Sequence, residues 1–208
     1  MKPRPPGAVR IIAGQLRGSR LPVPDHPGLR PTSDRVRETV FNWLQPALPG
    51  SRVLDLFAGT GALGFEAASR GAGKVVLVER DAALAQALLA SALRLKASQV
   101  QVVPADALAW LQRPADARFD LVFLDPPFAA GLWESAAARL EPWLAPGALV
   151  YVECPRATPL ALPADWRLHR QGQTRDVDFA LFRPGDGAGP ESTATLHGEP
   201  NPQGKPSA

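Results

Sequence analysis

The stretch VLDLFAGTGALGFE, residues 53–66, decides the fold of this 208-residue chain. A short apolar run ends at Asp55, and a Gly-x-Gly-x-x-Gly pattern runs from Gly59 to Gly64. The next apolar run ends at Glu79, 24 residues after Asp55 (79 − 55). Glycines at a strand-to-helix turn let the backbone approach a nucleotide-like ligand, and an acid ending the second strand can accept hydrogen bonds from ribose hydroxyls. The stretch therefore predicts a β-α-β unit that binds a nucleotide-like cofactor.

Apolar runs and helical segments alternate along the rest of the chain. Strands that are apolar on both faces are typical of a parallel sheet covered by helices on two sides. Two further segments near the end predict an antiparallel hairpin at the edge of that sheet. We therefore expect an α/β, Rossmann-like fold with a mostly parallel sheet. The expected strands are 52–57, 74–79, 100–105, 119–125 and 148–154, the expected helices are 61–70, 82–95, 107–112 and 131–144, and the expected hairpin pairs 167–173 with 176–183.

The front of the chain has a different pattern. Residues 9–23 predict two short strands with a turn near Gly14. A helix with one apolar stripe is expected to begin at Ser33 or Asp34 and to run to about Gln45. The differences in pattern along the chain predict three parts: a basic N-terminal extension over 1–33, a cofactor-binding domain over 34–183, and a disordered tail over 184–208, where no apolar period is found.

The net charge of +3 is unevenly distributed. Residues 1–50 carry eight Lys or Arg and three Asp or Glu, a balance of +5, whereas residues 51–208 carry 15 basic and 17 acidic residues, a balance of −2. A basic segment on a slightly acidic body indicates either a surface that contacts a polyanion or a solvated basic surface. Charge alone leaves both interpretations open.

The composition argues against several other classes of protein. No apolar stretch approaches the roughly 18 residues of a membrane-spanning helix. The basic start is not followed by the apolar core of a secretory signal, so we expect a cytoplasmic protein. The single cysteine, Cys154, lies in an apolar run, where a buried and unreactive thiol is expected. The three histidines are scattered, so we expect no metal site.

Asp55 helps to identify the ligand of the glycine-rich turn. It lies just before the glycines, where a carboxylate would repel a pyrophosphate but attract the cationic amino-acid end of S-adenosylmethionine. Glu79 could then accept the two ribose hydroxyls of that cofactor. Asp106 follows the third expected strand, where it could accept from the adenine amino group or cap the next helix. The acids favour S-adenosylmethionine over a dinucleotide.

The sequence FLDPPF, residues 123–128, combines an acid, two prolines and an aromatic ring at the end of the fourth strand. In a doubly wound sheet this turn overhangs the cofactor crevice. The Asp125 carboxylate and a backbone carbonyl near Pro126 could accept both hydrogens of an exocyclic amine and so localise its lone pair. Phe128 could stack on a base removed from its helix. The motif predicts amine methylation of a nucleobase, whereas the alternative is a turn with a buried Phe128.

Several stretches together resemble the RsmD family of class I methyltransferases. They are RIIAGQLRGSRLPVP (10–24), GLRPTSDRVRETVFNWL (28–44), VLDLFAGTGALGFEAASRGA (53–72), VERD (78–81) and FDLVFLDPPF (119–128), within a similarity that covers roughly 10–182. The block RPTSDRVRETVFNWL is the specific part, since the glycine loop and DPPF recur in many amino-methyltransferases.

The resemblance implies a seven-stranded Rossmann-like sheet and S-adenosylmethionine as cofactor. It also implies methylation of N2 of a guanine in 16S rRNA, guanine 966 in the usual rRNA numbering. The partner would be that rRNA within the 30S subunit or an assembly intermediate, and the enzyme is expected to act as a monomer without metal. The basic segment over 10–37 would be the element that faces RNA.

These considerations give three sets of predicted site residues. The catalytic set is Asp125, Pro126, Pro127 and Phe128. The cofactor-binding set is Asp55, Phe57, Ala58, Gly59, Thr60, Gly61, Glu79, Arg80, Asp106 and Ala107. The RNA-binding set is Arg10, Gly14, Arg17, Gly18, Arg20, Arg30, Thr32, Arg35 and Arg37. Arg37 could instead, with Asn42, orient the cofactor or the base.

Other functions remain open at this stage. DPPF is shared with nucleic-acid adenine-N6 methyltransferases, and only the N-terminal block favours guanine. A nicotinamide-dependent oxidoreductase would use the same glycine loop, but Asp55 and the lack of an obvious acid or base at a hydride site argue against it. An RNA-binding assembly factor without activity would predict decayed motifs, whereas the glycine loop and DPPF are intact.

Overall fold

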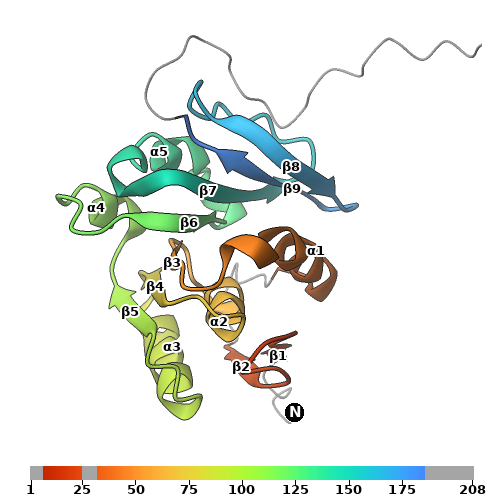
Figure 1. The fold of residues 1–208 in the computed structure, drawn as a ribbon, viewed down its shortest axis with the longest axis vertical. Coiled ribbons are helices and arrows are strands. Elements are labelled where there is room, and N and C mark those ends of the chain that lie inside the picture. The colour runs from red at the N-terminus through yellow and green to blue at the C-terminus, as the bar shows by residue number, and fades with distance from the viewer. Residues whose placement is uncertain (1–6, 25–31, 186–208) are drawn as a thin grey trace, which may run out of the picture.

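A seven-stranded sheet in the order β5-β4-β3-β6-β7-β9-β8 forms the centre of the computed structural model, which describes residues 7–24 and 32–185. Five neighbouring strands are parallel, and β9 runs antiparallel to both of its neighbours, β7 and β8 (Figure 1). The predicted α/β fold, with its edge hairpin, is therefore confirmed. The strands are β3 (Arg52–Asp55), β4 (Lys74–Glu79), β5 (Val100–Pro104), β6 (Phe119–Leu124), β7 (Leu144–Pro155), β8 (Arg167–Gln173) and β9 (Val177–Arg183).

Helices cover both faces of the sheet because its strands are apolar on both sides. On β6, for example, Leu121 and Phe123 face one core while Val122 and Leu124 face the other. The first core contains α1 (Asp34–Leu44) and α2 (Ala62–Ser69), with Leu88 of α3 (Ala82–Arg94). The second core contains α4 (Ala107–Leu111) and α5 (Trp133–Ala137).

An antiparallel hairpin of β1 (Gly7–Arg10) and β2 (Arg20–Val23) lies against α2 (Figure 1). Two side chains of α2 hold the loop between its strands. The buried Glu66 carboxylate accepts from the backbone N–H groups of Ile12 at 2.7 Å and Ala13 at 3.1 Å. Ser69 accepts from Leu16 through its hydroxyl at 2.9 Å. The hairpin is thus joined to the helix that follows the glycine loop.

The predicted helix over 131–144 is wrong. Only α5 is an α-helix there, flanked by the 3-10 turns η2 (Phe128–Ala130) and η3 (Glu141–Trp143), and β7 begins at Leu144. Gly131 adopts a left-handed φ of 60° before α5. Pro142 lacks a backbone donor and cannot continue an α-helix, so the chain turns into the next strand.

Some expectations lie partly or wholly outside the described residues. Residues 25–31, with Arg30, and residues 186–208 of the predicted tail are among these. Within the described residues, none of the helices is long and apolar enough to span a bilayer. The same residues contain no group of three or more His, Cys, Asp or Glu side chains that could hold a metal ion. The division at 33/34 and 183/184 stays a prediction.

Candidate active site

The glycine-rich turn between β3 and α2 requires its glycines. Gly59 and Gly61 adopt φ values of 51° and 77°, a region that other residues rarely occupy. A Cβ on Gly61 would lie 2.6 Å from Leu88 Cδ2, and one on Gly64 would lie 2.2 Å from Leu77 Cδ2. The first two glycines therefore shape the loop, and Gly64 lets α2 pack closely on the sheet.

Two acids lie at the ends of neighbouring strands beside this turn. Asp55 is only 2% exposed, and its carboxylate accepts from the N–H of Gly64 at 3.0 Å. Burial raises the pKa of Asp55 to about 7; the hydrogen bond from Gly64 opposes the shift and the nearby charge of Glu79 adds to it. Glu79 accepts from the N–H groups of Gly59 and Asp81, both at 2.8 Å. The Glu79 carboxylate thus fixes the glycine-rich loop, and it lies at the same edge of the sheet as Asp55, where β3 and β4 end.

The other predicted cofactor residues follow the ends of β3, β4 and β5. Asp106 comes just after β5 and caps α4 by accepting from Ala109 N–H at 3.0 Å, so the capping interpretation is correct. That cap leaves its other carboxylate oxygen available for an adenine amino group. Of the remaining predicted residues, Ala58, Thr60 and Ala107 are buried, Phe57 is half-buried, and Arg80 is exposed.

The DPPF turn lies beside the glycine-rich turn because β6 pairs with β3. Asp55 is in register with Phe123, so Asp125, two residues after Phe123, lies just past the end of the adjacent strand β6. Asp125 is half-buried, and its Oδ2 accepts from the Thr32 hydroxyl at 3.3 Å. Burial holds the pKa of Asp125 well above its usual value, and the charges of Glu153 and Asp55 raise it further.

The rest of the DPPF turn is divided between the interior and the surface. Pro126 is buried and Pro127 is exposed. Phe128 is half-buried, with its ring centroid 6.0 Å from that of Trp133. Part of the Phe128 side chain therefore stays accessible at this edge of the sheet, where an aromatic ring can contact a base.

Sequence reasoning missed a buried acid behind this turn. Tyr151 and Glu153 project from β7, and the tyrosine hydroxyl donates to Glu153 Oε2 at 2.6 Å. Glu153 is 5% exposed and Tyr151 is fully buried. The run ALVYVEC showed an acid in a buried strand, which was the available signal. Cys154 in the same run is buried, and burial raises the pKa of its thiol to about 12, as an unreactive thiol requires.

Two RNA-binding predictions need correction, those for Arg37 and Thr32. Arg37 is fully buried and forms ion pairs with Asp34 at 2.7 Å and Glu66 at 3.6 Å, so it cannot reach a phosphate. Thr32 is buried and donates to Asp125, so it supports the DPPF turn instead. Gly14 is exposed and also permits close contact within the protein, since a Cβ there would lie 1.9 Å from the backbone oxygen of Ser69; its contact with RNA stays a prediction.

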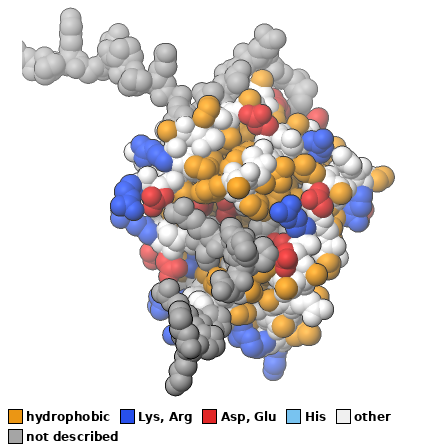
Figure 2. Space-filling model, turned by 180° about the vertical axis from the view of Figure 1, so that it is seen from behind, with side chains coloured by type: hydrophobic (Ala, Val, Ile, Leu, Met, Phe, Trp, Pro, Cys, Tyr) orange, Lys and Arg blue, Asp and Glu red, His pale blue; other side chains and the backbone are white. Residues whose placement is uncertain are grey.

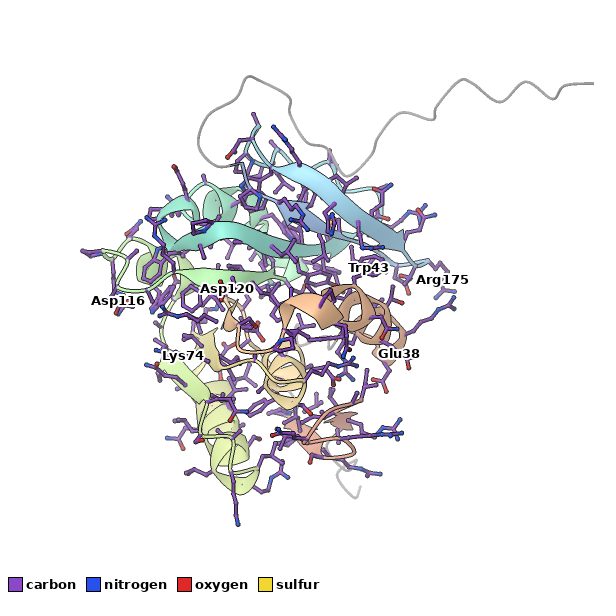
Figure 3. All side chains as sticks on the ribbon, in the orientation of Figure 1. Glu38, Trp43, Lys74, Asp116, Asp120 and Arg175 are labelled. Atoms are coloured by element: carbon purple, nitrogen blue, oxygen red, sulfur yellow. The ribbon has the colours of Figure 1, made fainter. Side chains whose placement is uncertain are left out.

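The remaining predicted RNA contacts that the structure describes are exposed. They are Arg10, Arg17, Gly18, Arg20 and Arg35. A pocket of about 350 Å³ lies between the hairpin loop and α1, and Glu38 projects from α1 nearby (Figure 3). The pocket is lined by Arg10, Ile11, Ile12, Ala13, Arg17, Gly18, Glu38, Asn42 and Arg70.

A second pocket, of about 260 Å³, lies at the opposite edge of the sheet, where the parallel strands begin. Lys74 and Asp116 line it, and both lie across the molecule from Glu38 in Figure 3. In open α/β sheets ligands bind at the carboxyl ends of the strands. We therefore place the candidate active site at the acids Asp55, Glu79 and Asp125.

Comparisons with known proteins show which family the chain belongs to. The family model described as Conserved hypothetical protein 95 matches residues 9–183. The chain is 47% identical over 180 residues to Ribosomal RNA small subunit methyltransferase D of Escherichia coli strain K12, covering 85% of this chain and 90% of that protein. It is 46% identical over 186 residues to the protein of the same name from Haemophilus influenzae, covering 87% and 96%.

Solved structures show the same fold. The structure of yhhF from Escherichia coli has a TM-score of 0.79 and 43% identity, covering 86% of this chain and 99% of that one. An RNA methyltransferase from Salinibacter ruber in complex with S-adenosyl-L-homocysteine has a TM-score of 0.60 and 17% identity, covering 79% and 99%. The second likeness concerns the fold alone.

Proposed function

Since the chain belongs to the RsmD family of small-subunit ribosomal RNA methyltransferases, we propose that it transfers a methyl group from S-adenosylmethionine to N2 of a guanine in 16S rRNA. One observation carries the proposal. The cofactor acids Asp55 and Glu79 and the DPPF acid Asp125 lie at the ends of β3, β4 and β6, which are neighbours in the sheet. A cofactor and an amine held by these residues would therefore meet at one edge.

The residues of the glycine-rich turn fit S-adenosylmethionine. Gly59 and Gly61, both with left-handed φ, have no side chains, so a ligand can approach the backbone of the turn there. Asp55 would hold the cationic amino-acid end, Glu79 the ribose hydroxyls, and Asp106 the adenine amino group. When bound, the cofactor supplies a methyl group activated by a sulfonium.

The DPPF turn would hold the target amine. An exocyclic amine is a weak nucleophile because its lone pair is delocalised into the ring. The Asp125 carboxylate and the backbone carbonyl before Pro126 or Pro127 would accept its two hydrogens, which favours a lone pair directed at the methyl group. Prolines fix φ, so the carbonyl is oriented before substrate arrives. Phe128 would contact the face of the base.

The basic hairpin and the start of α1 would contact the rRNA backbone. Arg10 and Arg17 border the 350 Å³ pocket, and Arg35 is exposed on α1. Seen from behind the view of Figure 1, the visible Lys and Arg side chains are scattered over the described surface and do not form one patch (Figure 2). Neutralising phosphates with these arginines would make binding weaker at higher salt.

The nearest alternative is methylation of adenine N6, which the same turn could perform. The family membership favours a small-subunit rRNA substrate, and the family resemblance of the block around 30–44 favours guanine. A nicotinamide-dependent oxidoreductase has no support from the comparisons, and the buried Asp55 would oppose a pyrophosphate.

Incubation with labelled S-adenosylmethionine and small subunits that lack the modification tests the proposal. We expect label on N2 of a single guanine of 16S rRNA. Label on an adenine would reject the guanine assignment, and no label despite demonstrated cofactor binding would point to another substrate.

The role of Asp125 is tested by Asp125→Ala. We expect transfer to be abolished while cofactor affinity stays near the wild-type value. Asp120→Ala is the matched control, because Asp120 lies at the other end of β6 and accepts from Arg52 N–H at 2.7 Å (Figure 3). A collapse of cofactor affinity in Asp125→Ala would show that Asp125 is misplaced in this proposal.

A further inference from the structure

The end of β7 places a second acid beside Asp125. β6 and β7 are parallel, with Phe123 opposite Tyr151 and Leu124 opposite Val152. The next position brings Asp125 opposite Glu153. Asp125 lies two residues after Phe123, and Glu153 lies two residues after Tyr151. Phe123 and Tyr151 belong to the first core, so both acid side chains are on the face of the sheet that α1 covers.

The position of Glu153 is fixed by its neighbours. The buried Tyr151 hydroxyl donates to Glu153 Oε2 at 2.6 Å, a short distance typical of a charge-assisted bond. The indole N–H of Trp133 donates to the backbone carbonyl of Glu153 at 2.7 Å. The Tyr151 ring in turn contacts Phe123 edge-on, with centroids 5.9 Å apart. An acid held this firmly next to the DPPF turn is more than a solvated surface group.

We propose that Glu153, held by Tyr151, is a positioning residue that makes Asp125 the proton acceptor for the methylated amine. The inference rests on the proposed function for the identity of that amine. Of the two acids, Asp125 would touch the substrate, and Glu153 acts through it. The role of Glu153 is electrostatic, because a second negative charge nearby makes the Asp125 carboxylate a stronger base.

Proton transfer is needed because the methylated nitrogen carries a positive charge. The amine lone pair forms the bond to the methyl carbon, and the electron pair of the broken carbon–sulfur bond stays on sulfur. An N–H bond then breaks, its electron pair returns to nitrogen, and the proton goes to an oxygen of Asp125. The neutral Asp125 carboxyl afterwards releases this proton to water.

Groups from every neighbouring element act on Asp125. Asp55 of β3 and Glu153 of β7 both oppose its negative charge, whereas the hydroxyl of Thr32, which precedes α1, donates to it and favours the charged form. Glu79 of β4 acts on Asp55. Of these acids only Glu153 is outside the predicted cofactor contacts, so it can be changed without removing a cofactor ligand.

The test is Glu153→Gln, whose amide oxygen can still accept from Tyr151. The Asp125 carboxyl is followed by carbon-13 NMR in the cofactor-free protein labelled at aspartate, with its signal assigned by its loss in Asp125→Asn. We expect the Asp125 titration to move to lower pH by about 1 unit or more, as removal of a close like charge does. The acidic limb of the kcat/KM profile should move in the same direction.

Asp178→Asn is the matched control, since Asp178 is also a buried acid, on β9, and accepts from Ala157 N–H at 2.9 Å. It should leave the Asp125 titration in place. If Glu153→Gln does not fold, Tyr151→Phe decides. This variant removes the hydroxyl that donates to Glu153 and stabilises its charge, so the Asp125 titration should also move to lower pH, but by less than in Glu153→Gln.

An unchanged Asp125 titration in a folded variant overturns the inference, even if activity falls, because such a loss is structural. The NMR titration needs neither cofactor nor RNA. A failure of this inference is therefore distinguishable from a failure of the proposed function, which the labelling of small subunits measures.

Discussion

Replacing the buried acid of the glycine-rich turn should stabilise the cofactor-free protein in a pH-dependent way. Asp55 is 2% exposed, and burial raises its pKa from 3.8 to about 7. The folded protein thus holds this proton more tightly than the unfolded chain does. The stability that results is present below pH 3.8 and is lost as the pH rises through 7.

The magnitude follows from the two pKa values. Their difference of about 3 pH units corresponds to about 4 kcal/mol at 1.36 kcal/mol per unit. Asp55→Asn cannot ionise, and its amide oxygen can still accept from Gly64. The free energy of unfolding of the variant, relative to wild type, should therefore rise by about 4 kcal/mol between pH 4 and pH 8. Relief of the repulsion on Asp125 adds to the same sign.

Denaturant unfolding of both proteins at pH 4 and pH 8 measures this difference. Asp120→Asn controls for the loss of one negative charge, because Asp120 also accepts a backbone N–H but lies at the exposed start of β6. The reasoning is refuted if the Asp55→Asn difference changes between the two pH values by no more than that of the control. Such a result would mean that Asp55 reaches solvent in the cofactor-free protein.

Three further predictions concern the same framework. Wild-type affinity for S-adenosylmethionine, measured by calorimetry, should fall as the pH drops below 7, by up to about tenfold per unit, and this dependence should be lost in Asp55→Asn. Gly14→Ala should detach the β1–β2 hairpin from α2, since its Cβ would lie 1.9 Å from the Ser69 oxygen. Gly18→Ala, with a φ of 83° and open space around the Cβ, should lower the free energy of unfolding by only about 1–2 kcal/mol. Hydrogen exchange of the hairpin amides distinguishes the two variants. Glu66→Gln should lower the free energy of unfolding by about 3–5 kcal/mol, because it breaks buried ion pairs, and a change below 1 kcal/mol would contradict that role.

Most of the fold was predictable because β3, β4, β6 and β7 contain apolar runs and several turns carry a local signal. The glycine spacing predicted β3, α2 and β4, and the hairpin expected over 167–173 and 176–183 is formed by β8 and β9. The segment 131–144 failed because its apolar content suits a helix, whereas Pro142 and Gly131 interrupt it. In this segment the helix-breaking residues Gly131 and Pro142 decide the local structure more than its apolar composition does.

The candidate site was predictable where its residues are adjacent in sequence and unpredictable where the fold brings them together. Asp125 was identified within a continuous motif. Glu153 is 28 residues farther along (153 − 125), and only the pairing of β6 with β7 reveals that it faces Asp125. Arg37 looked like one of several exposed arginines, and its burial depends on Glu66 of another helix. No local pattern encodes such a contact.

The crowding of acids at this edge has a physical consequence for which ligand the fold can accept. Burial and the charges of neighbouring acids raise the pKa values of Asp55 and Asp125, and Glu153 is one of the charges that act on Asp125, so the edge is unfavourable for any further negative charge. A dinucleotide pyrophosphate would add such a charge beside Asp55, whereas a ligand with an ammonium and a sulfonium would relieve the repulsion. The same glycine turn that serves dinucleotides elsewhere is therefore selective here through the acid that precedes it. Cofactor binding and ionisation of these acids must then favour each other. A bound cation lowers the pKa of each nearby carboxyl group, and ionised carboxylates in turn increase the affinity for the cation.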